Sequence, residues 1–118
     1  MKARKFEDLL VWQHAHQLVI KIYKLSKTFP KDEIFGLTAQ IRRATVSVPA
    51  NIAEGFKRAT VADKLRFYNI AQSSLEEVRY YLILSQYLGY LQASELMGNL
   101  EDVSRLLEGF MKALKRKK

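Results

Sequence analysis

The chain has 118 residues, a length typical of one domain, and 48% of them are hydrophobic, which is enough to build a core without covalent staples. It contains no cysteine, which excludes disulfides, thiolate metal sites and cysteine nucleophiles and favours the reducing cytoplasm as its compartment. The 20 Lys and Arg exceed the 12 Asp and Glu to give a net charge of +8, and most of the excess lies near the two ends of the chain.

The first predicted helix covers residues 8–27. Its apolar side chains Trp12, Ala15, Val19 and Ile22 recur at three- and four-residue spacing, which is typical of one buried helical stripe. Residues 28–32 form the predicted connection, because Pro30 and the residue before it resist helix continuation.

The second predicted helix starts near Asp32 or Glu33, where acidic side chains suit the helix dipole, and Gly55 is the predicted stop. Pro49 lies inside this pattern and removes one backbone hydrogen bond. We expect a kink at Pro49 with the helix continuing beyond it. A break into two short helices is the alternative.

The third predicted helix runs from a cap at Thr60 to about Leu88, and Asp63 completes a capping-box pattern with Thr60. Gly89 and Gly98 bracket the next turn. The core stripe of this helix consists of five side chains: Tyr68, Ala71, Leu75, Val78 and Leu82.

Ser94 is the predicted N-cap of the fourth helix, which carries a strongly periodic apolar row from Leu96 to Leu114. Two pairs of opposite charge at i,i+4 spacing, 101 with 105 and 108 with 112, are expected to support its solvated face. Short connections make successive helices antiparallel. The predicted fold is therefore all-α: an up-and-down antiparallel four-helix bundle with a kinked second helix, in a single domain over residues 1–118 with a basic tail from about 112 to 118.

The third helix has more apolar side chains than one core needs. Tyr80, Ile83 and Tyr87 form an additional row, and Tyr90 follows just after the helix. Tyrosines tolerate water, so this row is either ordinary surface or a subunit interface, where tyrosine is enriched. The interface interpretation predicts a homo-oligomer, the usual form of self-association.

A polar row follows helical spacing along the second helix. It is either a solvated face or a hydrogen-bonded seam at a subunit contact, in which any desolvated charge needs a partner. Its members are Gln40, Arg43, Ser47, Asn51 and Glu54.

The sequence offers no catalytic, metal or cofactor site, so we do not expect an enzyme. The two histidines, His14 and His16, point about 200° apart on a helix and cannot chelate one metal ion. The five glycines are scattered singly and form no phosphate-binding loop. The most apolar window, residues 80–91, is too short to span a bilayer, so no membrane association is expected.

Several basic groups suit contact with RNA or another nucleic acid, because Lys and Arg neutralise phosphates without reading sequence. The alternative is that the lysine-rich tail only aids solubility. The candidate residues are Arg42, Arg43, Lys57, Arg58, Lys112, Lys115, Arg116, Lys117 and Lys118.

Four segments carry a resemblance to a known family: residues 6–18, 29–37, 40–55 and 71–77. The chain resembles the four-helix-bundle proteins encoded in intervening sequences of bacterial 23S ribosomal RNA genes. Residues 40–55, QIRRATVSVPANIAEG, are the most specific segment. Gln72 stands where many members have glycine.

The resemblance implies a left-handed up-and-down bundle that assembles as a pentamer and associates with RNA. Similar proteins are accessory subunits of diversity-generating retroelements, in which a basic barrel binds nucleic acid and a reverse transcriptase. Two functions follow as hypotheses: a homo-oligomeric RNA-associated protein, or an interaction scaffold that holds a protein partner without touching nucleic acid.

Overall fold

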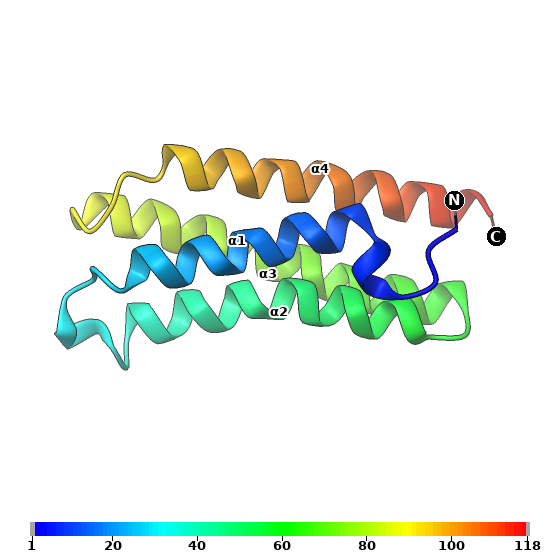
Figure 1. The fold of residues 1–118 in the computed structure, drawn as a ribbon, viewed down its shortest axis with the longest axis horizontal. Coiled ribbons are helices and arrows are strands. Elements are labelled where there is room, and N and C mark those ends of the chain that lie inside the picture. The colour runs from blue at the N-terminus through cyan, green and yellow to red at the C-terminus, as the bar shows by residue number, and fades with distance from the viewer. Residues whose placement is uncertain (1, 118) are drawn as a thin grey trace.

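The computed structural model describes residues 2–117, and these fold into four long helices joined by short connections. They are α1 (Leu10–Ser26), α2 (Leu37–Lys57), α3 (Val61–Tyr87) and α4 (Ser94–Arg116), with 3₁₀ turns η1 (Phe6–Asp8) before α1 and η2 (Lys31–Glu33) before α2. Successive helices run antiparallel, so the predicted up-and-down four-helix bundle is confirmed (Figure 1). The molecule measures 47 × 24 × 20 Å.

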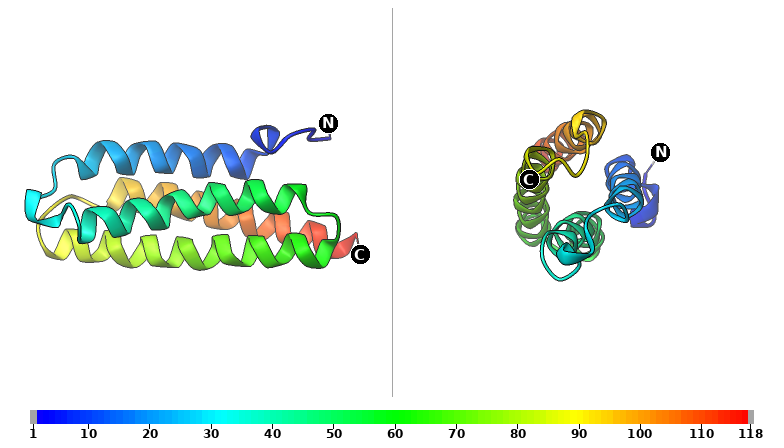
Figure 2. Two further views of the ribbon diagram at one scale, coloured as in Figure 1. Left: turned by 90° about the horizontal axis from the view of Figure 1, so that it is seen from below. Right: turned by 90° about the vertical axis from the view of Figure 1, so that its left-hand side faces the viewer.

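Each helix packs on its two neighbours in a closed cycle, α1 on α2, α2 on α3, α3 on α4 and α4 on α1. Figure 2 shows this cycle end-on. The predicted core stripe of α3 is confirmed, since Tyr68, Ala71, Leu75, Val78 and Leu82 are all buried. The predicted stripe of α1 is only partly right: Ala15 and Ile22 are buried, but Trp12 and Val19 are half-buried. One stripe at a period of 3.6 residues on each helix is enough to fill the centre of such a bundle.

Polar contacts join the helices outside this core. The Arg79 guanidinium of α3 forms an ion pair with Glu101 of α4, Nη1 to Oε2 at 2.6 Å, and a second with Glu76 at 3.1 Å. Arg105 pairs with Asp102. The expected pairing of Glu101 with Arg105 is therefore wrong, because Glu101 faces the neighbouring helix.

Pro49 does not break α2, which is helical without interruption from Leu37 to Lys57. The alternative of two short helices is wrong, and the kink stays a prediction. The helix begins later than expected because Glu33 lies in η2 and its side chain caps α2: Oε1 accepts the Leu37 N–H at 3.0 Å.

Gly55 does not end α2, contrary to the sequence-based expectation. It lies buried inside the helix, where an added Cβ would come within 2.5 Å of the Tyr68 ring. Glycine is needed there because α2 and α3 approach closely around that ring. By contrast Gly89, with φ at +77°, has the left-handed backbone expected after a helix.

The start of α3 is capped as predicted, with the Thr60 Oγ1 accepting the Asp63 N–H at 3.1 Å. The start of α4 differs by one residue: Ala93 is the N-cap, and its N–H donates to the Gln86 Oε1 at 2.8 Å. Gly98 lies within α4 and does not belong to the turn.

Candidate nucleic-acid interface

One end of the bundle collects most of the excess positive charge. The antiparallel topology brings the starts of α1 and α3 and the ends of α2 and α4 together, beside both termini (Figure 1). We call this the basic end. Its Lys and Arg side chains are Lys2, Arg4, Lys5, Lys57, Arg58, Lys64, Arg66, Lys112, Lys115, Arg116 and Lys117.

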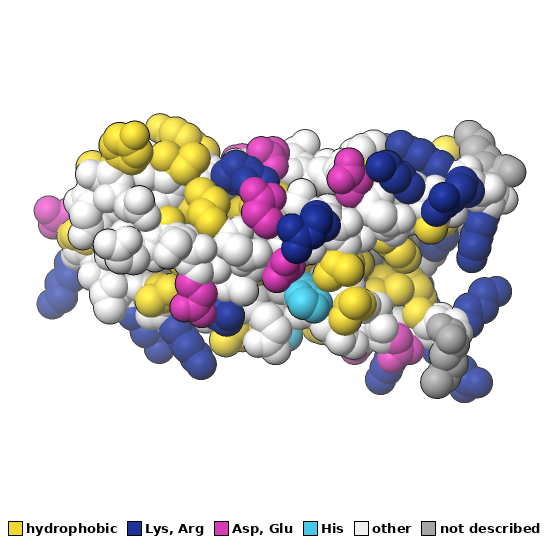
Figure 3. Space-filling model, turned by 90° about the horizontal axis from the view of Figure 1, so that it is seen from above, with side chains coloured by type: hydrophobic (Ala, Val, Ile, Leu, Met, Phe, Trp, Pro, Cys, Tyr) yellow, Lys and Arg dark blue, Asp and Glu magenta, His cyan; other side chains and the backbone are white. Residues whose placement is uncertain are grey.

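Acidic groups at the basic end are fewer than half as many. They are Glu7, Asp8, Glu54, Asp63 and Glu108. Over the rest of residues 2–117, basic and acidic side chains nearly balance. Figure 3 shows Lys and Arg side chains projecting from the basic end on one face of the molecule. The +8 net charge is thus a property of one end and not of the whole surface.

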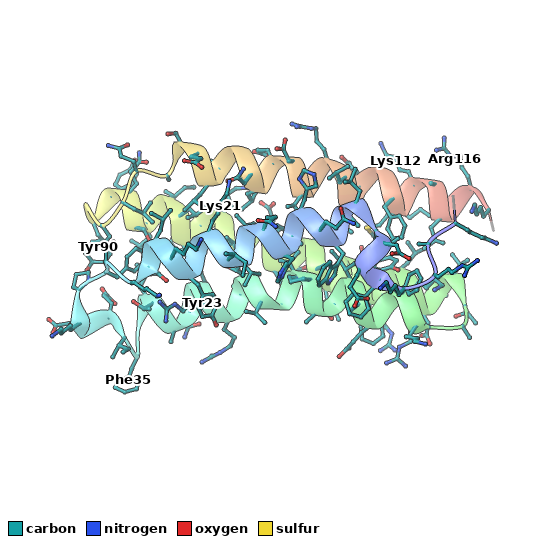
Figure 4. All side chains as sticks on the ribbon, in the orientation of Figure 1. Lys21, Tyr23, Phe35, Tyr90, Lys112 and Arg116 are labelled. Carbon is teal, nitrogen blue, oxygen red and sulfur yellow. The ribbon has the colours of Figure 1, made fainter. Side chains whose placement is uncertain are left out.

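Four cations of the basic end come from α4 and the residue after it. Lys112, Lys115, Arg116 and Lys117 are all exposed, and Figure 4 shows Lys112 and Arg116 projecting from the last turns of α4. None of the four forms an ion pair with a described acidic side chain. Lys118, also a predicted contact, lies outside the described residues.

Two arginines of the basic end share one aromatic ring. The Arg58 guanidinium lies 4.5 Å from the centre of the Phe67 ring, and that of Arg66 lies 5.0 Å from the same centre. Arg66 also reaches the Asp63 carboxylate at 3.4 Å. A guanidinium stacked on a ring keeps its N–H edge free, which suits bidentate contact with phosphate.

Lys64 has a structural role at the same end. Its Nζ donates to the backbone carbonyls of Phe56, at 2.6 Å, and Gly55, at 3.4 Å, and so satisfies acceptors at the end of α2. Burial lowers the pKa of this ammonium from its ordinary value. Lys64 therefore contributes charge to the basic end without being free to reach a ligand.

The N-terminal segment also joins this end, which the sequence-based list of contacts missed. The backbone N–H groups of Arg4 and Lys5 donate to the Asp8 Oδ2 at 3.0 and 3.3 Å, which folds the segment against η1. Its side chains were recognisable as basic in the sequence. Only the pairing of helix starts with helix ends shows that they lie near Lys57 and the tail.

Arg42 and Arg43 do not lie at the basic end. They are in the first half of α2, about 24 Å along the helix from Arg58 at 1.5 Å per residue. Arg42 is occupied at the end of α1: its Nε donates to the Ser26 Oγ at 2.8 Å, and its guanidinium lies 4.7 Å from the centre of the Tyr23 ring. The structure thus separates the predicted contacts into two groups.

The predicted interface row of α3 is exposed in the single chain. The exposed fractions are 57% for Tyr80, 41% for Ile83 and 86% for Tyr87. Tyr90 does not continue this row. It is half-buried, with its ring 5.3 Å from that of Phe29 and its hydroxyl donating to the Glu33 Oε2 at 2.9 Å.

The polar row of α2 divides between internal and exposed positions. The Ser47 and Ser74 hydroxyls are 2.8 Å apart across the contact between α2 and α3, and the Asn51 Nδ2 donates to the Ser47 Oγ at 3.0 Å. Gln40, Arg43 and Glu54 are exposed. The middle of this row therefore joins two helices of one chain.

An apolar groove of about 290 Å³ lies between α1 and α2, and helical periodicity alone does not predict it. The Trp12 ring lies flat against His16, with ring centres 4.9 Å apart. The other side chains that line the groove are Phe6, Val19, Val46, Pro49, Ala50 and Ala53.

Across residues 2–117 no group of three or more His, Asp or Glu side chains is placed to hold a metal ion. No helix within that range combines the length and apolarity needed to cross a bilayer.

Comparison with known proteins decides the family. The family model described as 23S rRNA-intervening sequence protein matches residues 7–109, which is most of the chain. The chain belongs to this family. The resemblance seen in the four sequence segments is therefore confirmed.

A solved structure supports the same fold for this member of the 23S rRNA-intervening sequence family. It is a protein of unknown function from the S23 ribosomal protein family of Bacteroides thetaiotaomicron VPI-5482, with a TM-score of 0.78 and 24% identity. The match covers 87% of this chain and 96% of that one. No curated protein matches. Nothing in the descriptions of the family and of this structure names a catalytic activity.

The family match places the cations of the basic end in two groups. Lys57, Arg58, Lys64 and Arg66 lie inside the matched residues 7–109. The side chains before and after that range come from the N-terminal segment and the last turns of α4. The basic end is thus built from the matched region and from both flanking segments.

Proposed function

We propose that this protein is a non-catalytic, cytoplasmic, homo-oligomeric bundle that binds RNA through its basic end. The observation that carries the proposal is the concentration of Lys and Arg where four helix termini meet. Cations that are exposed and not paired with acids can neutralise phosphates and release the counterions condensed on them. The family description, which refers to 23S rRNA, supports RNA as the polyanion.

Oligomerisation would multiply this effect. Each added copy repeats the basic end, so weak contacts add as avidity. The exposed row of Tyr80, Ile83 and Tyr87 and the apolar groove between α1 and α2 offer surface for subunit contacts. A pentamer is what the resemblance to barrel-forming relatives implies. Sedimentation should then give five times 13.7 kDa, and a monomer at high concentration would contradict this part of the proposal.

The experiment that tests RNA binding compares two triple variants with equal loss of charge. The first carries Lys112→Gln, Lys115→Gln and Lys117→Gln at the basic end. The control carries Lys24→Gln, Lys27→Gln and Lys31→Gln at or just after the end of α1, at the opposite end of the bundle. All six lysines are exposed and lack ion pairs with described residues.

RNA affinity is measured against salt concentration. About five phosphate contacts predict a log–log slope of about −3.5 on single strands and about −4.5 on duplexes. The basic-end variant should reduce the magnitude of the slope by about 2 to 3, at 0.7 to 0.9 per contact, while the control keeps it. Equal losses in the two variants would mean that only net charge matters, and a salt-independent affinity would sink the electrostatic mechanism.

A protein-interaction scaffold is the second candidate, and one observation favours it. At the end opposite the basic end, Phe35 is 93% exposed, and Figure 4 shows its ring pointing away from the bundle. An apolar side chain projecting into water is suited to a protein partner. The scaffold predicts that Phe35→Ser abolishes partner capture, whereas the basic-end variant leaves capture intact.

A further inference from the structure

The excess of positive charge and the most exposed aromatic rings of this molecule lie at opposite ends. The most exposed aromatic side chains among the described residues are Phe35, at 93%, and Tyr87, at 86%. Phe35 precedes α2 and Tyr87 ends α3, so both lie far from the basic end. Proteins that bind single-stranded nucleic acid instead interleave aromatic rings with cations, because unpaired bases stack on the rings.

Within residues 2–117, the aromatic rings of the basic end are already engaged. Phe67 carries the guanidinium groups of Arg58 and Arg66, at 4.5 and 5.0 Å, and Lys64 lies 5.5 Å from the centre of the Phe56 ring.

The remaining rings near that end are partly or fully buried. Tyr68 is buried and meets Phe110 edge-on, with ring centres 5.2 Å apart. Phe6 packs on Trp12, which in turn lies against His16. A base approaching the basic end therefore meets charge, and none of the aromatic rings near that end is exposed, as Phe35 and Tyr87 are.

We propose that the basic end recognises double-helical RNA through its phosphates and does not bind unpaired bases by stacking. This inference rests on the proposed RNA-binding function. In a duplex the bases are stacked inside, so phosphates and 2′-hydroxyls are what a protein reaches first. A surface of cations without exposed aromatic rings can bind the phosphates of a duplex. The unpaired bases of a single strand would add little to its affinity.

The shape of the basic end suits the same ligand. Its cations come from the termini of α2, α3 and α4 and from the N-terminal segment, so they spread over a face set by the two short dimensions of the bundle, 24 and 20 Å. Double-helical RNA adopts the A form, whose wide, shallow minor groove displays 2′-hydroxyls between the two phosphate backbones. A face of this size can therefore lie across that groove and contact phosphates of both strands.

Phe67 has a positioning role in this arrangement. Both Arg58 and Arg66 rest on its ring, which reduces the side-chain entropy that each arginine loses when it binds phosphate. Phe67→Leu should therefore weaken binding to duplex and single strand by the same factor. A ring that stacked on bases would instead affect the single strand alone.

The test measures fluorescence anisotropy with two probes, a blunt RNA duplex and an oligouridylate with the same number of phosphates. About five contacts at 0.7 to 0.9 per contact predict that the duplex binds about tenfold more tightly at about 0.1 M salt. The expected result is that preference, with an equal loss on both probes in Phe67→Leu and a larger loss on the duplex in the basic-end lysine variant, because each lost contact counts for more on a duplex.

Two results would overturn the inference in different ways. If the oligouridylate binds as tightly as the duplex, or if Phe67→Leu weakens only the oligouridylate, duplex recognition is wrong while RNA binding by the basic end stands. If neither probe binds, the proposed function itself fails. A circular dichroism melt of each variant checks that its helices remain folded.

Discussion

The two ends of the bundle share one core and present opposite chemistry. At the basic end, the termini of α2, α3 and α4 and the N-terminal segment carry Lys and Arg, and their aromatic neighbours are partly or fully buried. At the other end, which we call the apolar end, Ile34, Phe35, Tyr87 and Leu88 are exposed. A shared hydrophobic core therefore leaves the two ends of the bundle free to take on separate roles.

The two ends are also held together differently. At the basic end, α2 approaches α3 closely, with Gly55 against the Tyr68 ring. At the apolar end, a carboxylate holds two elements at once: Glu33 caps α2 through Leu37 and accepts the Tyr90 hydroxyl from the connection between α3 and α4. The basic end is thus held around a buried ring, and the apolar end around a carboxylate that joins two elements.

Replacing either of two phenylalanines near the apolar end should change the stability of the fold by very different amounts. Phe29 is buried against Tyr90, so Phe29→Ala should destabilise the fold by about 3–5 kcal/mol. Phe35→Ala, at an exposed site, should change stability by less than about 0.5 kcal/mol. Thermal unfolding of both variants measures the difference. Similar losses would mean that Phe35 is covered in the folded protein, as it would be in an oligomer.

The close approach of α2 and α3 at the basic end should make the stability of the fold sensitive to a methyl group at Gly55. Gly55→Ala places a methyl group against the Tyr68 ring and should destabilise by about 1–3 kcal/mol. Gly109→Ala is the matched control, since no atom outside its own helix turn lies within 4 Å of the added Cβ. Alanine should stabilise that exposed helical site by about 0.4–1 kcal/mol. Urea unfolding of the pair should give shifts of opposite sign.

Two neighbouring lysines should separate stability from binding at the basic end. Lys64 donates to carbonyls at the end of α2, so Lys64→Gln should destabilise by about 0.3–1 kcal/mol. Lys57 is exposed and makes no such contact, so Lys57→Gln should leave stability unchanged and weaken RNA binding. Thermal unfolding and RNA-binding assays of both variants test this difference. If Lys57→Gln lost stability and Lys64→Gln lost only binding, the two roles would be the reverse of those assigned here.

The smallest effect concerns the pH dependence of the apolar end. The hydrogen bonds that Glu33 accepts from Leu37 and Tyr90 hold its pKa below the ordinary value of 4.5. The unfolded chain therefore binds the proton more readily, so this contribution to stability is complete above about pH 4.5 and is lost as pH falls through the folded pKa.

Glu33→Gln should flatten the acid limb of the stability curve, measured as melting temperature against pH. Glu7→Gln is the control, because Glu7 is exposed at the basic end and neither caps a helix nor receives a tyrosine hydroxyl. An unchanged acid limb in Glu33→Gln would show that the carboxylate does not hold the apolar end.

Much of the fold could be predicted because it depends on short-range periodicity. The α3 stripe from Tyr68 to Leu82 is buried as expected, since spacing along one helix decides which side chains face inward. Gly55 was misread because glycine commonly follows a helix, and the sequence gives no sign that Tyr68 packs against it. Arg42 was grouped with the other basic residues because its partner Ser26 is 16 positions away.

The candidate site was predictable only in part for the same reason. Residue type alone shows that the tail is basic, as are Lys57 and Arg58. That these groups lie close together follows only from the antiparallel arrangement of the helices. Once successive helices are taken as antiparallel, the N-terminal segment must lie beside the end of α2. The contacts of Arg58 and Arg66 with the Phe67 ring depend on side-chain conformation, which helical periodicity does not predict.

The 47 Å length of the molecule has an electrical consequence. At physiological ionic strength the Debye length is about 8 Å, several times shorter than the molecule. The electrostatic potential of the basic end therefore falls to nearly zero before it reaches Phe35. Neutralising the lysines of the basic end should therefore leave the electrostatic potential at the apolar end unchanged. The bundle is long enough to bind a polyanion at one end and an apolar ligand at the other without electrostatic coupling between the two sites.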